Sequence, residues 1–129
     1  MKFLNKYVLP IGFAVKRMAY LRKEKETVEI AYSLNKVWAA IPKALTSLEW
    51  IVEQIDDTTH CARVKTKAGF ISWSSVLLID AVPVNENTTR VSVTAETPVT
   101  TITAIVDFGQ TGRRIELFFE ELARQLTSP

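Results

Sequence analysis

Cysteine and histidine each occur only once in this chain of 129 residues, as the neighbours His60 and Cys61. A single cysteine excludes an internal disulfide, so nothing in the sequence requires an oxidising compartment, and we expect the protein in a reducing cytoplasm. A zinc site usually takes several histidine, cysteine or carboxylate ligands at suitable spacing, and the sequence has no such group. We therefore expect no metal and no cofactor.

Long apolar runs are also missing. The longest one extends from Tyr7 to Val15, which is nine residues, whereas a helix needs roughly 20 to cross a bilayer. Lys16 and Arg17 follow this run where a secretory signal would place small residues and a cleavage site. We expect neither a transmembrane helix nor a signal peptide. A peripheral position at the membrane is the alternative to a free cytoplasmic protein.

Glycine and proline are scarce, with four and five residues, and the apolar fraction is 47%. These values are typical of an ordered globular protein rather than of a disordered or low-complexity one. The length suffices for a single hydrophobic core. We expect one folded domain at residues 26–129, preceded by a basic amphipathic segment at residues 1–25.

That basic segment has seven basic side chains and one acidic one, whereas the rest of the chain has nine and thirteen. Its apolar residues recur at intervals of three and four, the spacing of one helix face, which Pro10 should kink. Such a segment could contact an anionic membrane or a partner protein, or it could pack on the domain itself. The residues expected in this contact are Ile11, Phe13, Lys16, Arg17 and Lys23.

Alternating apolar and polar residues predict five strands, at residues 26–32, 50–56, 60–67, 70–84 and 88–96. Helical spacing predicts a helix from Leu34 to Leu48, which Pro42 should bend or divide. It also predicts a long terminal helix from Asp107 to Leu126, on which Gly112 should permit close approach to a sheet. The predicted fold is α+β: a curved antiparallel sheet, in the order β-α-β-β-β-β-α, that grips the C-terminal helix.

This order resembles the helix-grip fold of START and polyketide-cyclase-like proteins, in the compact form shared with the TATA-binding-protein fold. The resemblance covers about residues 26–126. Small uncharacterised bacterial domains are similar in a central strand like 71–73 (Ile-Ser-Trp) and in an Asp-x-Gly opening of the last helix, here 107–109. Larger relatives bind hydrophobic ligands between helix and sheet. The resemblance therefore implies a binding module for a small hydrophobic or lipid-like molecule.

His60 and Cys61 should lie on opposite faces of their strand, because successive side chains alternate. Cys61 shares parity with Arg63 and Lys65 and should point outward, whereas His60 shares parity with Val64 and should point inward near a hairpin end. A nucleophilic cysteine needs a base within reach, and the only histidine is on the wrong side. No nucleophile, base and oxyanion site can be assembled elsewhere, so we expect no enzyme.

The two faces of the fourth predicted strand, residues 70–84, suggest two different contacts. Trp73 should face inward, where filling the core is its simplest role. The alternative is a small apolar pocket with a few polar groups. Its predicted lining is Tyr32, Trp73, Ser75 and Phe118. Val76 and Leu78 should face outward, where a solvated sheet is normally polar. The basic segment or a second subunit could cover them, which would make this face a surface for self-association.

Charged residues on the last helix and the third strand could take part in binding or lie in solvent. Arg113 and Arg114 oppose the helix dipole in its first turn, so either a bound anion or nearby acidic side chains should offset them. Glu120 and Glu121 are adjacent, so they diverge and should lie on a solvated face. The basic row of the third strand has no interleaved aromatic residues, so we do not expect nucleic-acid binding.

Overall fold

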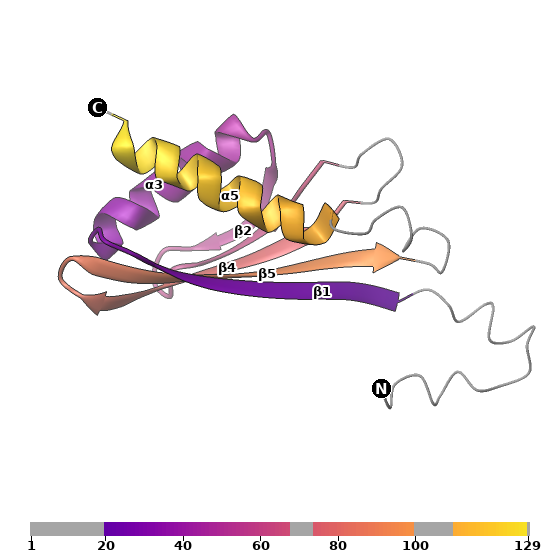
Figure 1. Ribbon diagram of the computed structural model, residues 1–129, viewed down its shortest axis with the longest axis horizontal. Coiled ribbons are helices and arrows are strands. Elements are labelled where there is room, and N and C mark those ends of the chain that lie inside the picture. Colours follow the sequence, from indigo (N-terminus) through magenta and orange to yellow (C-terminus); the bar gives the residue numbers. More distant parts are fainter. Residues whose placement is uncertain (1–19, 68–73, 100–109, 129) are drawn as a thin grey trace, which may run out of the picture.

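The structure is a computed structural model, and it describes residues 20–67, 74–99 and 110–128. Five strands form one antiparallel sheet in the order β1-β5-β4-β3-β2. Two helices, α3 and α5, lie together over one face of this sheet (Figure 1). The elements in chain order are β1 (Tyr20–Ile30), α3 (Leu34–Ser47), β2 (Ile51–Asp56), β3 (Cys61–Lys65), β4 (Val76–Asn85), β5 (Thr88–Val99) and α5 (Gln110–Thr127). The predicted α+β order of strands and helices is confirmed.

The strand order follows from one crossover and one meander. β1 pairs with β5, the last strand, over eleven residue pairs from Tyr20 with Val99 to Ile30 with Thr89. α3 then carries the chain to the opposite edge, where β2, β3, β4 and β5 pair in sequence. β1 and β2 are therefore the two edges of the sheet.

α3 is amphipathic, and its apolar residues recur at intervals of three and four. The side chain of Ser33 caps its first turn by accepting a hydrogen bond from the amide of Lys36 at 3.3 Å. Pro42 does not divide the helix, contrary to one of the two predicted outcomes. Its ring is exposed, and the buried stripe on the opposite side packs both halves on the core. The buried residues of that stripe are Val37, Ala40, Ile41, Ala44 and Leu45.

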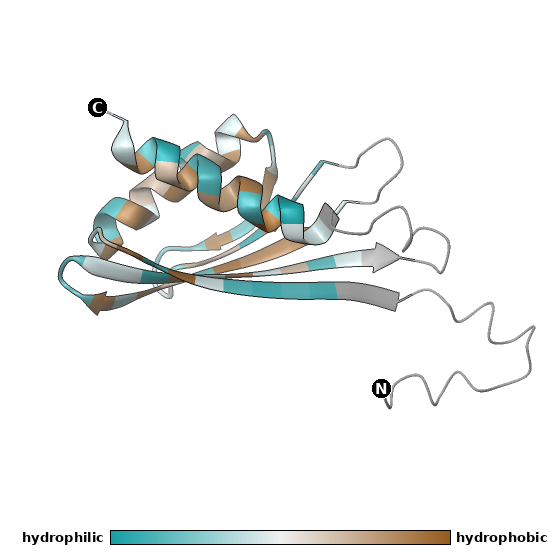
Figure 2. Cartoon of the chain, viewed as in Figure 1, coloured by the Kyte–Doolittle hydropathy of each residue, from teal (hydrophilic) through white to brown (hydrophobic). Residues whose placement is uncertain are grey.

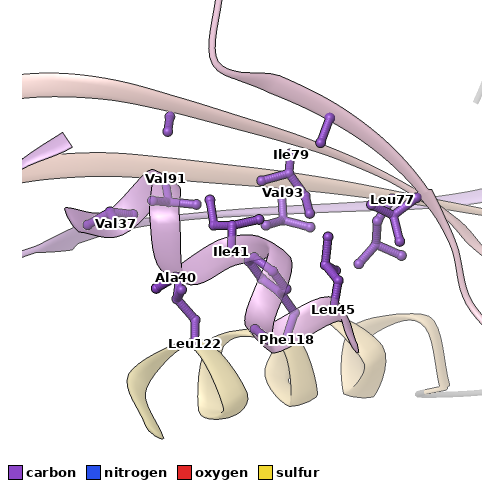
Figure 3. Packing of buried hydrophobic residues seen from close by; sticks show 14 of the residues in the cluster. Val37, Ala40, Ile41, Leu45, Leu77, Ile79, Val91, Val93, Phe118 and Leu122 are labelled. Carbon is purple, nitrogen blue, oxygen red and sulfur yellow. The ribbon is translucent and has the colours of Figure 1, made fainter. Parts of the chain in front are cut away.

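The hydrophobic core lies between the two helices and the sheet. α5 contributes Ile115, Phe118, Leu122 and Leu126. Side chains from α3, β4 and β5 meet Phe118 and Leu122 in the middle of this layer (Figure 3). The opposite face of the sheet has no helix over it in the described part of the chain (Figure 1).

β1 begins at Tyr20, six residues before the predicted boundary at residue 26. The part of the predicted basic segment from Tyr20 to Lys25 is therefore in the sheet. The alternation there is between lysine and glutamate and carries no hydrophobic period, so hydropathy could not reveal the strand. Figure 2 shows β1 as hydrophilic over most of its length. Asp107, predicted to cap α5, lies outside the described residues.

Candidate functional site

A group of polar residues is buried beneath the first turns of α5. We call it the Arg114 cluster. It comes from the ends of three strands and from the helix, and each member is at most 6% exposed. Its members are Thr66, Ser75, Thr97, Thr111 and Arg114.

One hydrogen-bond network joins these residues. Nη1 of Arg114 donates to Oγ of Ser75 at 2.6 Å, and Ser75 shares a short hydroxyl hydrogen bond with Thr97. Oγ1 of Thr97 is 2.9 Å from Oγ1 of Thr111, back on the helix. The amide of Ser75 donates to Oγ1 of Thr66 at 2.8 Å. The network therefore connects α5 with β5, with the residue before β4, and with the end of β3.

The alternation of the strands explains why the polar side chains gather at one end. On each of the three strands, the inward position nearest this end carries a hydroxyl group next to an apolar inward residue. Thr66 follows Val64, Ser75 precedes Leu77, and Thr97 follows Ala95. On α5, Thr111 and Arg114 likewise precede the apolar stripe. Five of the seven buried polar side chains of the described residues thus gather at one end of the interior, which we call its polar end, and the other two are Thr89 and Glu121.

Burial of the Arg114 guanidinium is unfavourable unless partners replace the water that it loses. A cation near the N-terminus of a helix also opposes the helix dipole. Hydrogen bonds within the Arg114 cluster replace part of this lost hydration.

An acidic side chain lies beside the same turn. Glu24 faces the helices from β1, opposite Ala95, and is half-buried. A Cβ atom added to Gly112 would be 2.9 Å from Oε1 of Glu24. Any larger residue at this position would push the Glu24 side chain away. Gly112 therefore permits the predicted close approach of α5 to the sheet. The Glu24 carboxylate therefore adds a negative charge near the start of α5.

The structure brings two of the predicted ligand-binding residues to the underside of α5. Ser75 is in the Arg114 cluster, and Phe118 follows Arg114 by one helical turn. Trp73 lies outside the described residues, two positions before Ser75. The residues that sequence reasoning did not assign to a site are Thr66, Thr97 and Thr111. Their inward parity at strand and helix ends was the available signal.

Tyr32 lies elsewhere. Its backbone oxygen accepts a hydrogen bond from Oγ1 of Thr89 at 2.8 Å, and Nζ of Lys36 is 5.0 Å from its ring centroid. Thr89 and Thr97 are eight positions apart on β5, which corresponds to roughly 26 Å at 3.3 Å per residue. The structure therefore does not bring Tyr32 and Ser75 together.

The apolar end of the interior is filled by side chains. Phe118 and Ile41 are fully buried, and Leu45 and Leu77 are buried around them (Figure 3).

The residues predicted to contact a membrane or partner are mostly outside the described residues. These are Ile11, Phe13, Lys16 and Arg17. Lys23 is part of β1, and its Nζ lies 3.3 Å from a carboxylate oxygen of Glu96 on β5. Lys23 therefore acts within the sheet as an ion-pair partner.

The facing of β3 agrees with the prediction. Cys61 is exposed, and its thiol lies 3.4 Å from Oδ1 of Asp80 on the outer face. His60 is half-buried on the helix side, where its ring meets Trp38 edge-on at 5.2 Å between centroids. Leu78 is 38% exposed on the outer face, beside an open hollow of about 480 Å³.

Glu121 is buried, so its predicted place on a solvated face is wrong. Nε2 of Gln125 donates to its carboxylate at 2.9 Å, and Arg124 donates to its other oxygen. These partners on its own helix allow the acid to be buried. The hydrogen bond from Gln125 is the main reason why the pKa of Glu121 lies below its ordinary value. Glu120 is exposed, as expected, and pairs with Arg113.

Within the described ranges, no group of three or more histidine, cysteine or acidic residues could hold a metal ion. No helix in that part of the chain is long and apolar enough to cross a membrane.

No family model matches the chain, and no curated protein is similar to it in sequence. Solved structures are similar in fold. Norcoclaurine synthase from Thalictrum flavum has a TM-score of 0.67 at 11% identity, over 89% of this chain and 91% of that chain. The chain has the helix-grip fold. Ara h 8.0201 matches at a TM-score of 0.56 and 11% identity, over 84% of this chain and 100% of that chain.

An uncharacterised protein from Bacillus thuringiensis has the same helix-grip arrangement, with a TM-score of 0.55 at 14% identity, over 81% of this chain and 96% of that chain. Identities of this size show the fold alone. The helix-grip fold supports catalysis in norcoclaurine synthase, so the fold itself is compatible with an enzyme.

Proposed function

We propose that this domain is a non-catalytic binding module for a small amphipathic molecule. The molecule would lie beneath α5, with its polar end at the Arg114 cluster and its apolar part toward Phe118. The observation that carries the proposal is the burial of a guanidinium and four hydroxyl groups in one hydrogen-bonded group beneath the first turns of α5. Ligand sites are typically apolar with a few convergent polar groups that fix the orientation of the ligand.

A protein of the same fold binds small molecules. Norcoclaurine synthase, which shares the fold at a TM-score of 0.63 and 11% identity, has been solved in complex with dopamine and hydroxybenzaldehyde. Both molecules combine an aromatic ring with hydroxyl groups. Ser75, Thr97 and Thr111 offer hydroxyl groups that both donate and accept hydrogen bonds, which suits a ligand of that kind.

The apolar wall of the proposed site rests on two predicted residues. Phe118 is one helical turn from Arg114, and Trp73 is two residues from Ser75 in the sequence. Tyr32 is not part of the proposed site, because it contacts Thr89 at the opposite end of β5 from Thr97. Catalysis is not part of the proposal, because the thiol of Cys61 lies on the outer face, away from the cluster.

A titration with 1-anilinonaphthalene-8-sulfonate, an apolar ring system with one anionic end, tests this function. We expect the full chain to enhance the fluorescence of the probe with a dissociation constant on the order of micromolar. Arg114→Met should weaken binding at least about tenfold, which is about 1.4 kcal/mol. Arg113→Met is the matched control, because Arg113 is exposed and pairs with Glu116 and Glu120.

Two outcomes would contradict the proposal. One is a folded chain, judged by its thermal unfolding, that binds no probe and carries no small molecule in native mass spectrometry. The other is equal loss of affinity in both arginine variants, because that would assign binding to surface charge rather than to the buried cluster.

A second function rests on the outer face of the sheet. Leu78 and Val82 are exposed there, and Leu78 lies next to Lys25 and Arg63. Together with the basic segment, this face could contact an anionic membrane or a partner, and Val76 and Leu78 could contribute to self-association. Sedimentation with phosphatidylserine vesicles, compared with phosphatidylcholine vesicles, tests it. Binding to the anionic vesicles that falls in Lys16→Glu/Arg17→Glu and at high salt would support it. Equal sedimentation with both vesicle types would exclude it.

A further inference from the structure

The two edges of the sheet differ in how they are protected. β1 has six charged residues among its eleven, and charges along an edge discourage pairing with another strand. β2 has two charged residues among six, and all six are exposed. Its three apolar residues, Ile51, Val52 and Ile55, are 64%, 40% and 41% exposed. An exposed apolar edge strand is a template for pairing with another chain.

A bulge sets which face each residue of β2 presents. Val52 pairs with Val64 and Ile55 with Ala62, both of which are buried on the helix side. Val52 and Ile55 therefore share the helix side, although they are three positions apart, because the register shifts between Val52 and Gln54.

The other four residues of β2 lie on the outer side. Ile51, Gln54 and Asp56 pair with the exposed residues Lys65, Arg63 and Cys61. Oε1 of Glu53 accepts a hydrogen bond from Nε of Arg63 at 3.2 Å, which places Glu53 on the outer side too. The faces from Ile51 to Asp56 thus read outer, helix, outer, outer, helix, outer. This order is the same in both directions.

We propose that β2 is a dimer interface, through which two copies of this chain pair antiparallel about a two-fold axis between Glu53 and Gln54. In this pairing, each of the six residues opposes a residue on the same face of the sheet. A regular strand of six residues would oppose inner residues to outer ones, so the match depends on the bulge. Val52 of each copy opposes Ile55 of the other on the helix side. Glu53 opposes Gln54, and Ile51 opposes Asp56, so no two like charges meet. The two five-stranded sheets become one continuous sheet.

The affinity should be modest, because the pairing segment has only six residues per copy. It buries less than the roughly 1,600 Å² of a standard protein interface. We expect a dissociation constant on the order of micromolar rather than nanomolar.

Light scattering after size-exclusion chromatography, over a concentration series that spans this range, is the first test. The full chain should shift from 14.5 kDa toward twice that mass as its concentration rises. Val52→Lys/Ile55→Lys places like charges opposite each other and should abolish the dimer. Val52→Lys/Ile55→Glu is equally polar but places opposite charges across the axis, so it should retain a dimer. Thr27→Lys on β1 is the control and should change nothing.

Disulfide trapping tests the register in a Cys61→Ser background. Paired strands bring opposed Cα atoms within the 4.4–6.8 Å that a disulfide requires. A mixture of Val52→Cys and Ile55→Cys chains should cross-link, whereas each chain alone should cross-link far less. A chain that stays monomeric throughout the series would overturn the proposal. So would a dimer that persists in the Val52→Lys/Ile55→Lys variant, or cross-linking that ignores the register.

Discussion

The two ends of the layer beneath α5 are built from the same strands and the same helix, but by different interactions. At the apolar end, Phe118 packs against Ile41 and Leu45 with no exposed surface on the first two. At the polar end, Arg114 and Ser75 are also buried but are held by a hydrogen bond. Packing of apolar side chains is strongly stabilising and weakly directional, whereas buried hydrogen bonds add little net stability but demand one geometry. The comparison indicates that the apolar end supplies most of the stability of this layer. The polar end determines how α5 is oriented on the strands.

The largest expected effect is at the apolar end. Phe118→Ala removes a fully buried ring and should lower the free energy of unfolding by about 3–5 kcal/mol. This is a large part of the roughly 5–15 kcal/mol of a typical domain. Urea denaturation measures it. Phe119→Ala, at a half-buried neighbour, is the control and should lose clearly less. Equal losses would mean that the core is not centred on Phe118.

At the polar end, Thr97→Val keeps the shape of the side chain but removes the hydroxyl between Ser75 and Thr111. We expect a loss of about 1–3 kcal/mol, because buried partners lose a hydrogen bond without gaining water. Thr94→Val, on the same strand but on the outer face, should change stability by less than about 0.5 kcal/mol. A neutral Thr97→Val would contradict the hydrogen-bonded description of this end.

The approach of α5 to β1 gives a smaller effect. Gly112→Ala should gain up to about 1 kcal/mol of helix propensity. The new methyl group must displace the Glu24 carboxylate, which opposes this gain. In a Glu24→Ala background the opposition disappears, so Gly112→Ala should be more stabilising there than in the natural chain. Thermal unfolding of the four proteins in this cycle measures the difference. Equal effects in both backgrounds would show that Glu24 does not limit the approach.

The smallest effect concerns Glu121, an acid on the apolar half of α5. Its pKa is lowered in the folded state, chiefly by the hydrogen bond from Gln125. Ionised Glu121 therefore stabilises the fold above its unfolded pKa of about 4.3, and this contribution is lost as the pH falls through the folded pKa. The stability difference between the natural chain and Glu121→Gln should shrink between neutral pH and pH values below that range. Denaturant titrations at both pH values check it, and a constant difference would refute it.

Sequence reasoning succeeded where one face of an element is apolar and the other is not. The parity of Cys61 against Val64 gave the facing of β3, and helical spacing gave α3 and α5. It did not reveal that β1 begins at Tyr20, because lysine and glutamate alternate there without a difference in hydropathy.

The polar end of the site was only partly predictable. The inward parity of Ser75 predicts a place in a pocket. Its partners, Thr97 and Arg114, are 22 and 39 positions away in the sequence. Parity gives the inward direction of Thr97, but nothing local shows which distant hydroxyl groups it contacts. The burial of Arg114 depends on how α5 is rotated, and that rotation is a property of the assembled layer.

α5 contacts the sheet through hydrogen bonds near its N-terminus and through apolar side chains further along. Apolar contacts around Phe118 and Leu122 would tolerate a small turn of the helix about its axis, because one methyl group can replace another in contact. The bonds from Thr111 and Arg114 to Thr97 and Ser75 would not, because each requires its own donor and acceptor within reach. The first turn therefore fixes the rotational setting of the entire helix. A substitution there could change which residues face inward two turns away, without touching any of them.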